Sequence, residues 1–363
     1  MAPNIGFDFD ECLVQAYTMV PFVLLFEVLL PRAMKAPGYS KAAKFYIDKA
    51  KSVFYQKVAD NEVKTKGTLF RPSLLKLMPK LLKLRQEGKI HKLFMYSNNG
   101  INELLNTVDH ILALTLKKAP YNITDGGLIK EADGLHVLAP RIHIDNPCRV
   151  ANEPKGADGF REKTLSGIRA CLGESISENE LWFVDDTEYH KDLMAHLKER
   201  YVVVESYSVH VSNKTLADMF IDSFPLEFFL PGSPVAAALV PEINRLMPGF
   251  RPTAKETKAS LIEKFGKVLN KFSEPGAGRA MGVWKEDHVN SDLKKIETRL
   301  STVINQEVPV VSNYPTVYSA PVGGACAKAY SAPIGGARQR GILPVSSLKR
   351  KTRKLRKDGK KRV

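Results

Sequence analysis

The segment IGFDFDECL (residues 5–13) is typical of a short apolar strand that ends in acidic residues. Side chains alternate between the two faces of a strand, so Asp8 and Asp10 point the same way. Two like charges on one face are tolerated beside a cation, with a shared proton, or in open water. The segment is therefore either a strand end that reaches solvent or a metal site with a carboxylate nucleophile.

Three further segments are predicted to be strands, and residues with helical spacing lie between them. They are KLFMYS (92–97), ELWFVDD (180–186) and RYVVVES (200–206). Strands that alternate with helices form a parallel sheet that helices cover on both faces. The expected fold class is therefore α/β, with a Rossmann-like parallel sheet whose first strand is NIGFDF (4–9).

Polar and charged residues stand where the predicted strands end. Ser97 and Asn98 follow one strand, Asp185 and Asp186 end another, and Lys163 begins a predicted helix. Ligands of parallel sheets bind outside the carboxyl ends of the strands. The sequence thus predicts one site that is assembled from separate segments, although Ser97 alone is typical of a loop start and Lys163 alone of a solvated surface.

These segments, in this order, resemble the four motifs of the haloacid-dehalogenase-like (HAD) phosphohydrolases over residues 4–205. DFDECL is similar to their DxDx[TV][LV], with Cys12 where Thr or Val is usual. LFMYSN is similar to their strand that ends in Ser or Thr, and WFVDD to their acidic fourth motif. DFDECLV is especially similar to the DLDETLV of RNA-polymerase C-terminal-domain phosphatases, from which the chain departs by having DD rather than DN in the fourth motif.

The resemblance implies a phosphatase that works through an aspartyl-phosphate. It implies that Asp8 is the nucleophile, and that Asp10 protonates the leaving oxygen and then activates water. It also implies that Ser97 and the backbone N–H of Asn98 bind the phosphoryl oxygens, while Lys163 holds the phosphate charge.

The resemblance further implies Mg²⁺ as the cofactor. Its ligands are expected to be Asp8, Asp10 (through the main-chain carbonyl), Asp185 and Asp186. Mg²⁺ prefers such oxygen ligands and neutralises part of the phosphate charge.

Some residues near the motifs have simpler interpretations. Lys155, in NEPKGADG, is an alternative to Lys163 for the third motif. Cys12 is interpreted as a small core residue and Trp182 as a residue that packs the sheet. His190 is expected on the surface of a helix.

The chain divides by composition into four parts. A helical cap insert interrupts the first part, and a cap of this family covers the site and shapes the substrate pocket. The parts are a HAD-like core (1–230) with the cap insert at 14–67, a helical C-terminal appendix (231–305), a flexible Gly/Pro/Ala/Ser linker (306–346) and a disordered polybasic tail (347–363). The linker repeats YSAP[VI]GGA, which is either plain linker or a docking motif presented twice.

The positive charge of the chain is concentrated at its C-terminus. Ten basic residues between 349 and 362 face the single acid Asp358, and they supply most of the formal net charge of +15. Such a basic segment binds nucleic acid through phosphates, attracts acidic proteins, or acts as a nuclear-localisation signal. Nucleic acid or an acidic protein is therefore an expected partner of this tail.

Cysteine usage and hydropathy indicate the compartment. The four cysteines form neither a zinc pattern nor a disulfide framework, which favours a reducing compartment. The apolar run VPFVLLFEVLL (20–30) is shorter than a membrane span and contains Glu27, so a buried helix is expected. We expect a soluble intracellular protein without a membrane partner, and the nucleus is one candidate location.

Four functions compete at this point. The first is a Mg²⁺-dependent phosphatase of a phosphoprotein, suggested by the DLDETLV-like segment and the tail. The second removes phosphate from nucleic-acid ends, and the third acts on small metabolites. The fourth is a non-catalytic HAD-fold protein that binds nucleic acid or serves as a scaffold.

Overall fold

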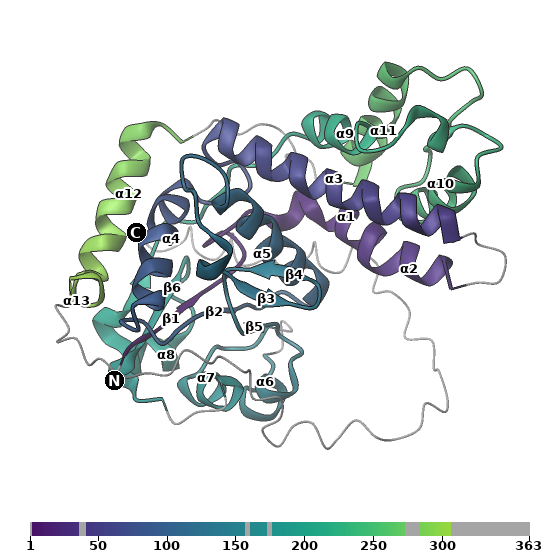
Figure 1. Ribbon diagram of the computed structural model, residues 1–363. Coiled ribbons are helices and arrows are strands. Elements are labelled where there is room, and N and C mark those ends of the chain that lie inside the picture. The colour runs from purple at the N-terminus through teal and green to yellow at the C-terminus, as the bar shows by residue number, and fades with distance from the viewer. Residues whose placement is uncertain (1, 36–40, 157–159, 173–175, 273–283, 306–363) are drawn as a thin grey trace, which may run out of the picture. The chain divides into compact units, whose positions relative to one another are not determined.

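The computed structural model describes residues 2–35, 41–156, 160–172, 176–272 and 284–305 (Figure 1). The predicted linker and polybasic tail lie outside these residues. Met1–Lys155 and Phe160–Gln306 belong to one compact unit, so the sheet and the predicted C-terminal appendix are parts of the same body.

A five-stranded sheet forms the centre of this unit, and every strand pair in it is parallel. The α/β parallel sheet expected from the sequence is therefore confirmed, with four strands at the predicted segments and a fifth, short edge strand. The order is β5 (Arg141–Ile142), β2 (Lys92–Tyr96), β1 (Asn4–Phe7), β6 (Leu181–Asp185) and β7 (Tyr201–Val203). A separate antiparallel hairpin consists of β3 (Ile129–Glu131) and β4 (Gly134–His136).

Helices cover both faces of the sheet, as the alternation of its side chains requires. On one face, Ile5 and Phe7 of β1 pack in a core that includes α4 (Pro72–Gln86) and α5 (Asn102–Leu116). On the other face, Phe94 and Phe183 pack against α7 (Leu165–Leu172) and α8 (Lys191–Leu197). The short helix α6 (Pro147–Asn152) contacts α7.

The face of the sheet that packs against α7 and α8 requires a glycine at residue 6 of β1. A Cβ atom at residue 6 would lie 2.5 Å from Cζ of Phe94 and 2.6 Å from Cδ2 of Phe183. Both rings are fully buried, so neither can move aside without disturbing the core. The glycine therefore lets two aromatic rings from the neighbouring strands meet over the central strand.

The insert after β1 is helical, and it leaves and rejoins the core through paired backbone. Val14 forms an antiparallel bridge with Phe70, and the N–H of Gln15 donates to the carbonyl of Leu69 at 2.9 Å. We call these two paired segments, 13–15 and 68–71, the stalk. Between them lie η1 (Ala16–Met19), α1 (Val20–Val23), η2 (Leu24–Leu29), α2 (Leu30–Ala33) and the long helix α3 (Lys41–Thr65).

The apolar run at 20–30 lies within a longer helical segment of the insert. Within the described residues, Ala16–Ala33 is long and apolar enough to cross a membrane, with a mean hydropathy of 1.4, and 56% of it is buried. Its Phe22 packs on Phe54 of α3, with ring centroids 4.7 Å apart, and Glu27 accepts hydrogen bonds from Lys51 and Tyr55. These are the contacts of a core helix, as predicted for the run.

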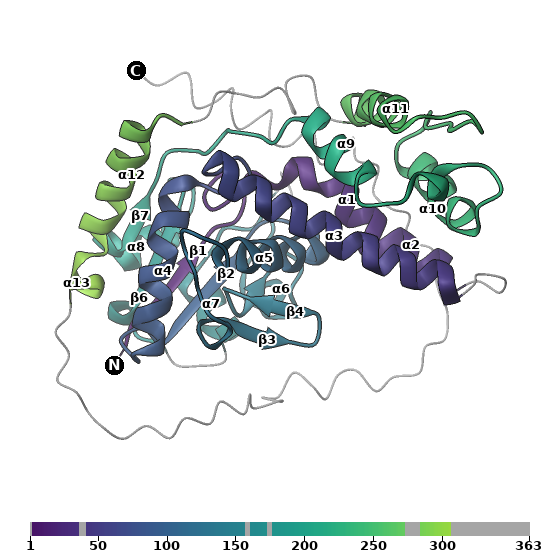
Figure 2. The ribbon, with the colours of Figure 1, turned by 45° about the horizontal axis from the view of Figure 1, so that its top comes forward.

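The C-terminal helices pack on two different parts of the unit (Figures 1 and 2). Phe265 of α11 stacks on Phe220 of α9 at 4.5 Å, and both rings contact Phe22 of the insert. In contrast, α12 runs along α4, where Lys80 pairs with Glu297 at 3.6 Å. The helices of this region are α9 (Asn213–Ile221), α10 (Pro234–Leu246), α11 (Lys258–Phe272), α12 (Glu286–Arg299) and α13 (Ser301–Ile304). Besides η1, the described residues form the short 3-10 helices η3 (Asp125–Gly127), η4 (Glu178–Glu180), η5 (Lys198–Arg200) and η6 (Leu226–Phe229).

Candidate metal and phosphoryl-transfer site

The strand order reverses its direction between β1 and β6. From β1 the chain builds outward through β2 to β5, and then returns to add β6 and β7 on the other side. In an open parallel sheet, such a reversal creates a crevice at the carboxyl ends of the two strands, where ligands bind. Asp8 directly follows β1 and Asp185 ends β6, so both carboxylates stand at this crevice.

The pairing of β1 with β6 places Asp8 beside Asp185 at the carboxyl ends of the two strands. Phe7 pairs with Val184 in parallel register, and the N–H of Asp8 donates to the carbonyl of Val184 at 2.9 Å. The alternation that places Phe7 in one core turns Asp8 to the opposite face, on the side of Phe183. Both carboxylates are buried there, Asp185 completely.

Lys163 lies between these two carboxylates. Its Nζ is 2.7 Å from Oδ1 of Asp8 and 2.7 Å from Oδ2 of Asp185, and only 1% of the residue is exposed. Burial alone would lower the pKa of Lys163, but the carboxylates of Asp185 and Asp8 outweigh it and raise the pKa. The rival lysine, Lys155, is exposed. The structure therefore brings Lys163, and not Lys155, to the acidic residues.

Asp186 completes a group of three carboxylates. Oxygen atoms of Asp8, Asp185 and Asp186 lie within 4.8 Å of one another, which is close enough for one metal ion to bind all three. Burial, and then the charges of Asp8 and Asp185, raise the pKa of Asp186; burial and the charge of Asp8 also raise the pKa of Asp185. Lys163 offsets one of the three negative charges. A hard divalent cation fits the remaining oxygen donors.

Asp10 stands beside this group but is not part of it. Its Oδ2 accepts a hydrogen bond from Nδ2 of Asn99 at 3.0 Å, whereas its buried Oδ1 has no hydrogen-bond partner among the described residues. Burial, with help from the charges of Asp8 and Glu11, raises the pKa of Asp10 to about 7. A carboxyl group with such a pKa can donate and accept protons near neutral pH.

Ser97 and Asn98 follow β2 at the same edge of the sheet. The Oγ of Ser97 accepts from the N–H of Asn99 at 2.9 Å, which forms the tight turn that carries Asn99 to Asp10. The side chain of Asn98 is fixed at both ends, because it donates to the carbonyl of Arg161 and accepts from Arg149. Sequence reasoning assigned no role to Asn99; the signal that was there is the run of Ser and Asn after the strand, residue types that are common in such turns.

A buried ion pair, which the sequence did not indicate, braces this loop. Arg149 donates to the carbonyl of Ser97, to Oδ1 of Asn98 at 2.8 Å and to the Glu153 carboxylate at 2.7 Å. Glu153 also accepts from the N–H of Thr164 at 2.9 Å, the residue after Lys163. One ion pair therefore fixes both the loop after β2 and the segment that carries the lysine.

The prediction that His190 lies on the surface of a helix is wrong. The residue is 2% exposed, and its Nδ1 accepts from the backbone N–H of Lys163 at 3.1 Å. Burial lowers the pKa of His190 to about 2, so the ring is neutral and carries its proton on Nε2, which lies 3.8 Å from Oδ2 of Asp185. This hydrogen bond holds His190 against the backbone of Lys163. Cys12 and Trp182 are core residues, as predicted.

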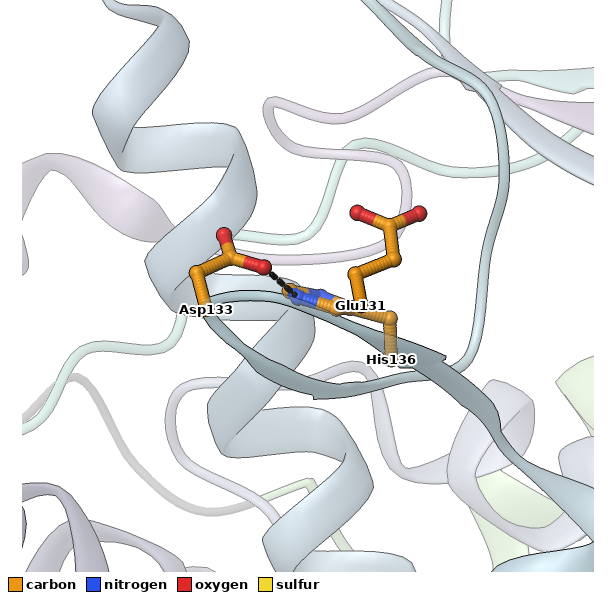
Figure 3. Close-up of side chains that lie close together, drawn as sticks. All are labelled: Glu131, Asp133 and His136. Carbon is orange, nitrogen blue, oxygen red and sulfur yellow. Dashed lines mark hydrogen bonds and ion pairs between the residues drawn. The ribbon is translucent and has the colours of Figure 1, made fainter. Parts of the chain in front are cut away.

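A second group with metal-ligand residue types lies on the β3–β4 hairpin (Figure 3). Ligand atoms of Glu131, Asp133 and His136 are within 4.8 Å of one another. The His136 Nε2 lies 2.9 Å from Asp133, and its Nδ1 lies 3.3 Å from the buried Asp109. Arg141 pairs with both Asp109 and Glu131. Because Arg141 and His136 together already pair with these acids, the group requires no metal ion to account for it.

Comparison of the chain with protein-family models found no match, and neither did comparisons with curated proteins and with solved structures.

Proposed function

We propose that the chain is a metal-dependent phosphatase that acts through an aspartyl-phosphate, as the resemblance to HAD-like phosphohydrolases implies. The observation that carries the proposal is the buried Lys163 between Asp8 and Asp185, with Asp186 beside them at the carboxyl ends of β1 and β6. A buried lysine flanked by carboxylates presents both a nucleophile and a cationic partner for phosphate.

In the proposed reaction, an oxygen of Asp8 attacks the phosphorus of a phosphate monoester. The phosphorus–oxygen bond to the leaving group breaks, and Asp10 gives its proton to the departing oxygen. A water molecule then attacks the aspartyl-phosphate while Asp10 takes a proton from it, which releases inorganic phosphate and restores both aspartates. The pKa of about 7 at Asp10 suits a group that works in both directions.

The remaining residues bind and orient the phosphate. The positive charge of Lys163 offsets the negative charge of the phosphate. The turn formed by Ser97 and Asn98 supplies the hydroxyl and the backbone N–H that the resemblance implies as hydrogen-bond donors. A divalent cation, for which Mg²⁺ is our choice, would be held by Asp8, Asp185 and Asp186, with the main-chain carbonyl of Asp10 as the further ligand implied by the resemblance. When bound, it supplies positive charge that offsets the phosphate oxygens.

The substrate class that we propose is a phosphoprotein. The support comes from the DLDETLV-like first motif and from the basic tail at 349–362, which favours large acidic partners over metabolites. Nucleic-acid ends that carry a terminal phosphate are the second candidate substrate, and small phosphate esters are the third. Assays of all three classes with the same enzyme preparation would rank them.

Replacement of the nucleophile tests the proposal. The purified 363-residue chain is expected to hydrolyse p-nitrophenyl phosphate only with Mg²⁺, and Asp8→Asn is expected to lower the rate by roughly 10³-fold or more. Mass spectrometry of the acid-quenched wild type during turnover is expected to find phosphate on the peptide that contains Asp8.

Two controls separate chemistry from folding and from contamination. Asp133→Asn changes an acid of the hairpin group and is expected to leave turnover unchanged. Asp8→Asn is expected to retain the far-ultraviolet circular dichroism of the wild type. Turnover that persists in Asp8→Asn, or phosphate found on another peptide, would refute the assignment of Asp8.

A further inference from the structure

The turn after Asp10 is tight and conformationally costly. Glu11 has a φ of 61°, in the left-handed region that residues other than glycine rarely adopt. Asp10 forms a bridge with Val14, and the N–H groups of Leu13 and Val14 both donate to the carbonyl of Phe9. A non-glycine residue in this conformation costs about 1–2 kcal/mol, so neighbouring groups must hold the turn.

Arg71, from the far end of the insert, holds this turn. Its Nε donates to the carbonyl of Cys12 at 2.6 Å, its Nη2 to the carbonyl of Glu11 at 3.2 Å, and its backbone N–H to the carbonyl of Leu13 at 3.0 Å. The side chain is fully buried. The N–H of Tyr207 adds a second hydrogen bond to the carbonyl of Glu11, at 2.6 Å.

The carboxylate that neutralises Arg71 comes from the last long helix of the described chain. Nη1 of Arg71 lies 3.1 Å from Oδ2 of Asp292, a residue 221 positions away on α12. The hydroxyl of Ser73 donates to the same oxygen, and the rings of Tyr207 and Trp284 lie 5.7 and 5.1 Å from the guanidinium. A buried guanidinium requires such a partner, because an unpaired buried charge is strongly destabilising.

We propose that Asp292 and Arg71 are positioning residues for the phosphatase reaction, and that docking of α12 on α4 fixes the turn that carries Asp10. The proposal rests on the function proposed above. Among the described residues, neither side chain forms a hydrogen bond or ion pair with the three clustered carboxylates, so the effect passes through the backbone of residues 11–13. Helix α12 is thereby part of the catalytic unit, although it is far from β1 in sequence.

The test compares two variants of α12 that each remove one negative charge. Asp292→Asn weakens the buried pair with Arg71, whereas Glu297→Gln removes the exposed pair of α12 with Lys80 of α4. With p-nitrophenyl phosphate and Mg²⁺, Asp292→Asn is expected to lower kcat by about 10- to 100-fold, because a displaced proton donor slows chemistry. KM is expected to stay within about twofold, because the phosphate-binding residues are intact.

Hydrogen exchange of the backbone amides supplies a readout that does not depend on activity. Leu13 and Val14 are expected to exchange faster in Asp292→Asn than in Glu297→Gln, while Asp8 keeps its protection by β6. Arg71→Lys keeps the positive charge but loses the planar guanidinium group that donates to the carbonyls of Cys12 and Glu11. It is therefore expected to lower kcat as Asp292→Asn does.

Each outcome decides the proposal. Unchanged exchange at Leu13 and Val14 in Asp292→Asn would overturn it, as would an equal loss of kcat in Glu297→Gln. If Asp292→Asn fails to fold, Ser73→Ala, which removes only a hydrogen bond to Asp292, takes its place in both assays. A wild type without turnover would refute the proposed function alone, and the exchange data would still decide whether α12 holds the turn.

Discussion

At the scale of single residues, two carboxylates compensate the buried charge of Lys163. Lys163 is 1% exposed, and its Nζ lies 2.7 Å from an oxygen of Asp8 and 2.7 Å from an oxygen of Asp185. A buried charge requires such partners, whereas Lys155 is exposed to solvent, where its charge is hydrated.

Replacement of this lysine is expected to destabilise the metal-free protein. Lys163→Met leaves two buried carboxylates facing each other, and the loss of one partner from a buried ion pair costs roughly 3–5 kcal/mol. Urea unfolding in the presence of a chelator measures the loss. Mg²⁺ is expected to restore part of the stability, because the cation replaces the missing positive charge.

The matched control is Lys155→Met, which removes the same charge from an exposed position eight residues earlier in the chain. Its free energy of unfolding is expected to stay within about 0.5 kcal/mol of the wild type, as for most surface substitutions. Equal losses of unfolding free energy in the two variants would show that the buried ion pairs of Lys163 stabilise the protein no more than an exposed lysine does.

At the scale of elements, the insert depends on a buried carboxylate at its exit. Glu62, near the C-terminal end of α3, accepts from the N–H groups of Thr68, Leu69 and Phe70 at 2.9–3.1 Å, and it is fully buried. These residues form one side of the stalk, whose other side contains Val14. A side chain of the insert thereby organises the backbone that returns the chain to the core.

Glu62→Gln keeps the size of the side chain and is expected to weaken the stalk. The amide group of glutamine presents N–H donors where the backbone already supplies donors, so buried N–H groups lose an acceptor at a cost of about 1–3 kcal/mol. Urea unfolding measures this loss. Hydrogen exchange at Leu69 and Phe70 is expected to accelerate.

Asp60→Asn is the control for this variant, because Asp60 lies on the same helix and forms an exposed ion pair with Lys118. Its unfolding free energy and the exchange of residues 68–70 are expected to match the wild type. If Glu62→Gln behaves in the same way, the carboxylate does not hold the stalk.

Elements with a strong local pattern were predictable, and the weakly patterned ones were not. Strands β1, β2, β6 and β7 are nearly continuous apolar runs, which is typical of strands buried on both faces. Strand β5 has only two residues, Arg141 and Ile142, which are too few to show an alternation of apolar and polar side chains. It forms because it can pair with the free edge of β2. The hairpin β3–β4 is held by Asp109, which accepts from the N–H groups of Val137 and Leu138, and this long-range contact has no local signal.

At the scale of the whole molecule, the segments that form helices were predictable, but the elements on which they pack were not. The helices after residue 230 were visible as helices, yet nothing local shows that α11 packs on the insert through Phe265 or that α12 places Asp292 beside Arg71. Contacts between residues more than 200 positions apart depend on the tertiary fold. The basic tail, which supplies most of the net charge, lies outside the described residues, so its binding to nucleic acid or acidic protein stays a prediction.

The clustered acids make the stability of the whole molecule depend on pH. Burial and neighbouring charges raise the pKa of Asp10 from 3.8 to about 7, and they also raise the pKa values of Asp185 and Asp186. Between pH 3.8 and about 7 the folded state therefore holds a proton on Asp10 that the unfolded chain has released. Stability falls with rising pH wherever the folded state binds more protons, so this window contributes a progressive loss.

The metal-free protein is therefore expected to have a lower Tm at pH 8 than at pH 6, and Mg²⁺ is expected to raise Tm more at pH 8. The cation binds ionised carboxylates of the folded state, and a ligand at 100 times its Kd stabilises by about 2.7 kcal/mol. Calorimetry with chelator and with Mg²⁺ at both pH values measures the two effects. Asp186→Asn, which removes one donor, is expected to lose most of the Mg²⁺ response, whereas Asp133→Asn in the hairpin group is expected to keep it. An equal loss in both variants, or a Tm that Mg²⁺ leaves unchanged at pH 8, would show that the carboxylates at the ends of β1 and β6 do not form a cation site.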